Sequence, residues 1–235
     1  MTFTIRKLAI ATACAATAFA AQAADTIYGA DFGSSNSYTT SFLSGVGATF
    51  ASVPGNFELK SQDGVTGVGV SGATAGEIDR GEMISGTFSQ GIQISGIRLG
   101  LLFDGPEYND VNEVAQITAY WAAGGSQSFT LTATGATTAV WTGLGSVSSF
   151  GSGAVNGGTG AWDLINPFGT QLVSKISFAA LTGVPSSTCT GCNNQSDYTL
   201  VSVTAVPEPE TYAMLLAGLG LMGTIVRRRN KSKAA

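Results

Sequence analysis

The chain has 235 residues, of which 44% are hydrophobic and only 11% are charged, and it contains no histidine. The absence of histidine excludes the Ser-His-Asp triad, the Cys-His dyad and the usual zinc sites. Residues 24–206 carry thirteen acidic and four basic side chains, a net charge of −9. Nucleic acid and anionic lipid are therefore excluded as partners of this part of the chain.

The first 23 residues have the pattern of a secretory signal peptide. Two basic residues precede an uncharged segment at positions 8–20, and Ala21 and Ala23 are the small residues that signal peptidase reads. We therefore expect cleavage after Ala23. Cys14 lies inside the uncharged segment and leaves with the signal peptide.

Residues 24–205 are expected to form one domain with an all-β fold. Gly, Ser, Thr and Val dominate this body, and short apolar runs are punctuated by glycine. Strands are predicted at 26–32, 48–53, 57–60, 65–70, 82–88, 92–103, 114–121, 129–133, 138–142, 172–180 and 198–205. One-sided alternation in so many short strands indicates an antiparallel β-sandwich of the jelly-roll kind. The Gly- and Ser-rich segment 143–160 is expected to be a long surface loop.

Two local features of the strands can be predicted in detail. Apolar residues alternate along 92–103, but their phase flips at Gly96, which indicates a β-bulge there. The alternating runs 115–121 and 129–133 are separated by a segment containing Gly124 and Gly125, which is typical of a hairpin.

An acidic segment joins two of these predicted strands. Six side chains within ten residues carry oxygen ligands, namely Asp104, Glu107, Asn109, Asp110, Asn112 and Glu113. Calcium is a hard cation that takes six to eight oxygens, so the four carboxylates are candidate calcium ligands. The spacing does not match an EF-hand loop, and a solvated acidic turn is the alternative interpretation.

Other acidic and aromatic residues are candidates for carbohydrate chemistry. Glu77, Asp79 and Glu82 are close enough in sequence to consider a glycosidase-type carboxylate pair, whose separation the sequence does not fix. Tyr120, Trp121, Trp141 and Trp162 could stack on sugar rings. Core packing is the alternative, favoured for Trp121 by its place in an apolar alternation; Trp162, beside Asp163, is the best exposed candidate.

The two cysteines that remain after signal cleavage are Cys189 and Cys192. A four-residue turn can bring them within disulfide distance, and an exported protein meets an oxidising compartment. A redox motif would need the first cysteine at a helix start, whereas this pair lies in a polar segment. We therefore predict a structural disulfide that stiffens one loop.

The C-terminal 30 residues, 206–235, contain three consecutive segments of different chemistry. Pro207, Glu208 and Pro209 disfavour helix and predict an extended, accessible stretch. Residues 213–226 carry no charge and predict a single hydrophobic helix about 21 Å long, which is short for a bilayer core of about 30 Å. Its flanks are Tyr212 at one end and Arg227, Arg228 and Arg229 at the other, and the arginines predict a cytoplasmic C-terminus.

In this order, a Pro-Glu-Pro motif, a short apolar helix and an arginine cluster resemble the PEP-CTERM sorting signal of Gram-negative bacteria. The resemblance covers the tail only. It implies recognition by a membrane-embedded exosortase, cleavage near the Pro-Glu-Pro motif, and release to the cell surface or exopolysaccharide matrix. An ordinary C-terminal membrane anchor is the alternative interpretation.

Together these features predict an exported protein that is not an enzyme. Its expected partners are signal peptidase, exosortase, the inner membrane transiently, and exopolysaccharide, in a biofilm or matrix role. A carbohydrate-binding module, assisted by calcium, is the second interpretation, and a carboxylate-based hydrolase is the third.

Overall fold

The computed structural model describes residues 24–43, 45–105, 111–151, 160–185, 196–206 and 218–224. Apart from one 3-10 turn, η2 (Gly29–Asp31), and the helical residues 218–224, the regular structure in these ranges is β. The strands are β1 (Asp25–Tyr28), β2 (Ser37–Phe42), β3 (Val46–Val53), β4 (Phe57–Gln62), β5 (Val65–Val70), β6 (Met83–Gly100), β7 (Val114–Trp121), β8 (Ser126–Gly135), β9 (Thr138–Trp141), β10 (Ser146–Ser149), β11 (Trp162–Ile165), β12 (Leu172–Ala180) and β13 (Thr199–Val206). Every strand pair is antiparallel, so the predicted all-β, antiparallel class is confirmed.

The long strand β6 connects two groups of strands because it changes partners along its length. In its first half Gly86 lies between Phe50 of β3 and Ile176 of β12. In its second half Ile97 lies between Val203 of β13 and Leu164 of β11. One run of strands is therefore β2-β3-β6-β12-β7-β8-β9, and the other is β4-β5-β13-β6-β11-β10, with β1 added beside β13.

The bulge predicted at Gly96 is present in β6. Thr204 of β13 pairs with Gly96, but the next residue, Ala205, pairs with Ile94, so Ser95 is the extra residue. The predicted division between 82–88 and 92–103 is wrong, because β6 runs without a break from Met83 to Gly100, and the predicted residues 101–103 lie beyond its end. The even-numbered apolar phase includes Ile84, Phe88, Ile92 and Ile94, all of them buried. The pairing with β12 shifts register across the polar stretch, from Ile92 opposite Val173 to Thr87 opposite Lys175, but the strand continues through it.

The strands β2, β10 and β11 were not predicted, and the first two are rich in hydroxyl side chains. β2 pairs with β3, and a Thr39 to Thr49 hydroxyl contact of 3.1 Å links them on the exposed side. β10 pairs with β11, so part of the expected surface loop 143–160 is a strand. Pairing satisfies the backbone hydrogen-bonding groups of β2 and β10, although neither of these two strands carries a strong apolar pattern. The hairpin predicted for 115–121 and 129–133 is confirmed as β7 and β8.

Inward-facing side chains from both runs form one hydrophobic cluster. It includes residues of both halves of β6, such as Ile84 and Leu99, which are fully buried. At one side Phe32 stacks on Tyr38 at 4.8 Å and meets the edge of Phe57 at 5.0 Å, because η2 turns the chain inward.

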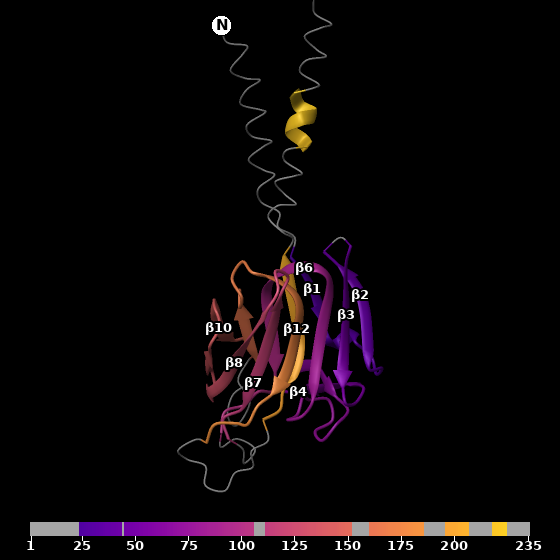
Figure 1. Cartoon of the computed structure of the whole chain (residues 1–235). Helices are drawn as coiled ribbons and strands as arrows, with labels where there is room; N and C mark the ends of the chain where they lie inside the picture. Colours follow the sequence, from indigo (N-terminus) through magenta and orange to yellow (C-terminus); the bar gives the residue numbers. More distant parts are fainter. Residues whose placement is uncertain are drawn as a thin grey trace, which may run out of the picture.

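The first and last strands of the domain meet at one end, and the β5–β6 segment lies at the other. β1 begins and β13 ends at the same end, the upper end in Figure 1, since Asp25 pairs with Ala205. At the opposite end Thr199 begins β13 beside Gly100, and the Ile78 N–H donates to the Tyr198 carbonyl at 2.7 Å. The segment between β5 and β6 therefore lies at the end of the domain that is distant from the tail.

Candidate functional site

The place where the domain meets its C-terminal tail is built from two adjacent strands. Ala205 is paired on one side with Asp25 of β1 and on the other with Ile94 of β6. Ala205 is fully buried, and β13 ends one residue later at Val206. Ala205 is thus held on both sides within the sheet, and Val206 is paired with Gln93 of β6.

The opposite end of the domain holds a cluster of acidic side chains, which we call the carboxylate cluster: Glu77, Asp79, Glu82, Glu113 and Asp197. Four of them, Glu77, Asp79, Glu82 and Glu113, are at most 7% exposed. Three acids of the cluster lie between β5 and β6, Glu113 directly precedes β7, and Asp197 lies in the segment before β13. Burying so many carboxyl groups is unfavourable unless each is hydrogen-bonded, paired or protonated.

Within this cluster Asp197 is the group that burial affects most. Burial, together with the negative charges of Glu77 and Asp79, raises the pKa of Asp197 to about 8. Glu77 Oε1 forms a salt bridge with Lys60 Nζ at 3.0 Å, and the Glu77 carboxyl group is hydrogen-bonded to Asp197. Burial also raises the pKa of Glu77. Burial and the neighbouring acids therefore favour the protonated form of Asp197.

The carboxylates of Asp79 and Glu82 hold the β5–β6 segment in place. Asp79 Oδ2 accepts from the Thr74 N–H at 2.6 Å, and Glu82 Oε2 accepts from the Asp79 N–H at 3.0 Å. Gly72 packs so closely against Glu82 Oε1 that any side chain there would displace it. These two acids are thus engaged with backbone, and the glycosidase-type pair considered for Glu77, Asp79 and Glu82 gains no support from their contacts.

The acidic segment between β6 and β7 is tied together at its two ends. Glu113 Oε2 accepts from the Phe103 N–H, and the Glu113 N–H donates to the Phe103 carbonyl at 3.1 Å. Asn112 Oδ1 accepts from the Gly105 N–H at 2.9 Å, and burial raises the pKa of Asp104. Glu113 is therefore a buried clamp, which contradicts the solvated-turn interpretation for this residue.

Calcium binding by this segment stays a prediction. Glu107 and Asp110, two of its four carboxylates, lie outside the described residues. Among the residues that the structure describes, no three acidic, cysteine or histidine side chains are grouped so that they could hold a metal. Glu113 already uses one oxygen on the Phe103 backbone.

The aromatic residues considered for sugar stacking mostly belong to the core. Trp162 is 1% exposed, and its Nε1–H donates to the Leu102 carbonyl at 2.8 Å, so it is not an exposed platform. Trp121 packs at the core edge against Phe168, with ring centroids 5.9 Å apart. Tyr120 is half-buried and lies under Lys175, whose Nζ is 5.1 Å from the ring centroid.

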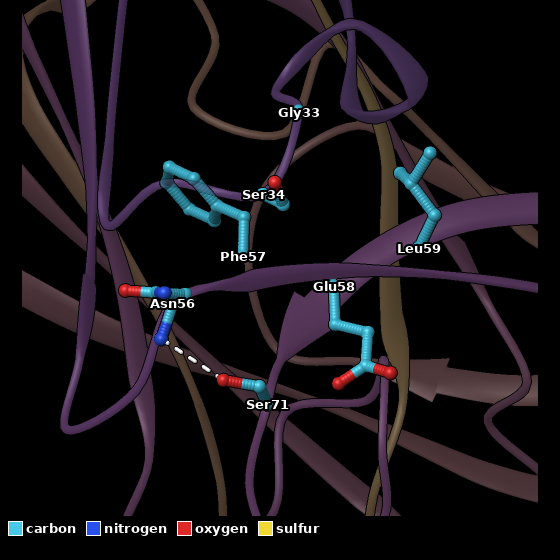
Figure 2. A pocket seen from close by; sticks show the side chains of 7 residues that line it. All are labelled: Gly33, Ser34, Asn56, Phe57, Glu58, Leu59 and Ser71. Atoms are coloured by element: carbon cyan, nitrogen blue, oxygen red, sulfur yellow. Dashed lines mark hydrogen bonds between the residues drawn. The ribbon is translucent and has the colours of Figure 1, made fainter.

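A shallow hollow of about 500 Å³ lies beside β4 and is lined by Gly33, Ser34, Asn56, Phe57, Glu58, Leu59 and Ser71. Figure 2 shows these side chains, and the Asn56 N–H donates to Ser71 Oγ at 3.0 Å. Phe57 is only 1% exposed, so its ring is not available to a ligand, whereas Leu59 is 45% exposed. The hollow offers one carboxylate and two hydroxyls without a stacking surface.

Several predicted site residues lie outside the described ranges. They are Ala21 and Ala23 of the signal peptide, Cys189 and Cys192 of the predicted disulfide, Pro207, Glu208 and Pro209 of the sorting motif, and Tyr212, Arg227, Arg228 and Arg229 of the helix flanks. In the part of the chain that the structure describes, no helix has the length and apolar character to span a bilayer.

The fold and the junction define a β domain whose last strand leads directly into a separate C-terminal segment. Comparison with protein families matches the PEP-CTERM protein-sorting motif to residues 205–230. The chain therefore carries this sorting motif, as its tail predicted, and the motif implies an exported protein sorted by an exosortase to the cell surface. No curated protein and no solved structure matches the chain.

Proposed function

We propose that this is a non-enzymatic protein of the cell surface or extracellular matrix, associated with exopolysaccharide in a biofilm. Signal peptidase removes residues 1–23, the tail anchors the domain transiently in the inner membrane, and an exosortase then releases it. The observation that carries the proposal is the sorting motif at residues 205–230, which begins within the last two residues of β13.

The arrangement of β13 supports release of a complete domain. β13 is paired with β6 and with β1, and its pairing ends with Val206 opposite Gln93. Cleavage after this residue removes no residue of β13. The released body keeps its full sheet, so we expect it to remain folded after processing.

The partner change within β6 supports a jelly-roll-like sandwich for the body. A strand that pairs with β3 and β12 in one half and with β11 and β13 in the other can bring two sheets face to face over a common core. Such a sandwich, closed around one hydrophobic cluster, is a stable extracellular module.

The engagement of the acidic residues supports a non-enzymatic role. A carboxylate hydrolase needs two acids at a defined separation that face a substrate cleft. In this protein Glu77 is paired with Lys60, Asp79 and Glu82 accept backbone N–H groups, and Glu113 clamps Phe103. These contacts are those of acids with a structural role.

The sorting step is tested by replacing two residues of the motif. In the producing cells, Glu208→Ala with Pro209→Ala should leave uncleaved protein in the membrane fraction, while the wild type is found outside the cell. Fractionation and intact mass of each pool measure the outcome. A matched control, Glu210→Ala just after the Pro-Glu-Pro tripeptide, should be released normally.

Wild-type-like release of the double variant would contradict exosortase sorting through Pro-Glu-Pro. The matrix role has a separate readout, because a matrix protein should co-purify with the cell's exopolysaccharide after gentle washing. Recovery of released protein only in the free medium would contradict matrix association while leaving sorting intact.

A further inference from the structure

A second hollow, of about 300 Å³, lies on the solvent side of the sheet formed by β1, β13, β6 and β11. Strand register places two rows of residues across these four strands. One row is Tyr28, Ser202, Arg98 and Asp163, and the other is Thr26, Thr204, Gly96 and Ile165. Their neighbours Ile27, Val203, Ile97 and Leu164 are buried in the core, so by alternation the two rows face outward.

The floor of this hollow is set by Gly96 and its bulge. Gly96 has no side chain, whereas the surrounding positions carry larger ones, and the sheet face is therefore depressed at this point. A Cβ at Gly96 would meet Thr204 Cβ at 3.5 Å and the Leu164 carbonyl at 3.8 Å, which are ordinary contacts. The fold thus tolerates a side chain at Gly96, and packing alone does not explain the depression.

Polar groups line the hollow in a fixed arrangement. Arg98 Nε and Nη2 both donate to Asp163 Oδ2, at 3.1 and 3.0 Å. The structure gives the other carboxylate oxygen, Oδ1, no hydrogen-bond partner among the described residues. The Thr26 and Thr204 hydroxyls contact each other at 3.0 Å in the second row. The hollow therefore presents Asp163 Oδ1 as an acceptor, and the hydroxyl groups of Thr26 and Thr204, on four hydrogen-bonded strands.

One wall of the hollow is an exposed aromatic ring. Tyr28 is 52% exposed, although its register partner Ser202 is only 3% exposed. A pyranose has an apolar C–H face, which can stack on an exposed aromatic ring, and a rim of hydroxyl groups, which can bond to fixed polar groups beside that ring. The other hollow, in Figure 2, has the larger volume but its aromatic residue Phe57 is buried.

We propose that this hollow binds one neutral hexopyranose unit of a polysaccharide, with Tyr28 stacking on the sugar ring and Asp163 Oδ1 accepting from a hydroxyl. The volume is at the lower end for small-molecule sites, which fits a single ring. Arg98 is neutralised by Asp163 and the body has a net charge of −9, so an uncharged sugar is favoured over an acidic one. The proposal rests on the matrix association above and assigns its contact surface.

The test uses the exported protein purified from culture medium and measures its retardation in affinity electrophoresis. The probes are the neutral fraction of the cell's own exopolysaccharide, purified neutral glucan, mannan and galactan, and a polyuronate as the acidic arm. Tyr28→Ala and Gly96→Val should each weaken binding to a neutral probe by about tenfold or more. Gly96→Val is expected to fold, because its Cβ has room and valine suits a strand.

Leu59→Ala is the matched control, since Leu59 is an exposed apolar residue at the other hollow. Unchanged binding by Leu59→Ala with loss in both other variants supports the proposal. Equal binding by all variants, or binding only to the polyuronate, overturns it. If the wild type co-purifies with matrix but binds no neutral probe, the assigned site fails while the matrix role stands.

Discussion

The carboxyl groups of Glu77 and Asp197 share a hydrogen bond at the end of the domain opposite the tail. Glu77 follows β5 and Asp197 precedes β13, so the contact joins segments that are far apart in the chain. Lys60, Asp79 and Glu113 also act on Asp197, and the single cation among them does not neutralise the four acids. A proton held by Asp197 relieves this excess of negative charge.

The first prediction is that the free energy of unfolding falls as pH rises through the neutral range. The pKa of Asp197 is about 8 in the folded chain against an ordinary value of 3.8, so the folded state holds a proton that the unfolded state releases. The contribution is complete below about pH 4 and is lost as pH rises through about 8, with a slope of at most about 1.4 kcal/mol per pH unit for one proton. Glu77 and Glu82 have raised pKa values and act in the same direction.

Urea unfolding at a series of pH values measures this slope. Asp197→Asn keeps a hydrogen-bond donor toward Glu77 and removes the titrating group, so its slope between pH 5 and 8 should be clearly smaller than in the wild type. Asp63→Asn, on an exposed turn with a φ of 53° that asparagine accepts, is the control and should keep the wild-type slope. Equal slopes in all three proteins would refute a proton on Asp197.

The second prediction concerns the cation of the cluster. Lys60→Met removes the partner of Glu77, whose side chain is 5% exposed against 28% for Lys60. The remaining buried charge should lower the free energy of unfolding by about 1–2 kcal/mol at pH 7, less than for a fully buried pair because solvent reaches Lys60. Lys60→Met with Glu77→Gln should recover most of the loss. A double variant as unstable as the single one would contradict the pairing.

The third prediction separates core packing from ligand binding at Trp162. Because Trp162 is 1% exposed and its indole N–H is bonded to Leu102, Trp162→Ala should lower the free energy of unfolding by about 3–5 kcal/mol. Trp162→Phe keeps most of the volume and should lose less. If Trp162→Ala retained wild-type stability and lost polysaccharide binding instead, the residue would be an exposed platform after all.

Local patterns in the sequence predicted the features that depend on neighbouring residues. The Gly96 phase flip gave the bulge, the two alternating runs gave the β7–β8 hairpin, and the order of segments in the tail gave the sorting motif. Each signal lies within a few tens of residues. Strand β6 was divided in error because a polar stretch in the middle of a strand is locally identical to a turn.

Features that depend on distant pairing could not be predicted. β2 and β10 carry weak apolar patterns and are held by their partners, and β11 has only four residues, too few to show an alternation by itself. The row that joins Tyr28, Arg98 and Asp163 takes its residues from separate strands, and only the register brings them together. The same holds for Asp197 in the carboxylate cluster, whose environment is set by segments distant in sequence.

The fourth prediction compares two strand glycines that the sequence does not distinguish. Gly69 of β5 packs against the backbone of Glu77, so closely that a Cβ would overlap the Glu77 N, Cα and C atoms. Backbone cannot rotate aside as a side chain can, so Gly69→Ala should lower the free energy of unfolding by about 1–3 kcal/mol or more. It should also disturb the carboxylate cluster, because Glu77 must move.

Gly96→Ala is the matched comparison, because the nearest atom to its Cβ is Thr204 Cβ at 3.5 Å. This substitution removes backbone freedom from the unfolded chain and should raise the free energy of unfolding by about 0.4–1 kcal/mol. Urea unfolding of both variants at pH 5 and pH 8 measures the difference. Gly69→Ala should also change the pH slope set by Asp197, whereas Gly96→Ala should leave it unchanged. Equal effects of the two substitutions on stability would contradict the close contact between β5 and the segment that carries Glu77.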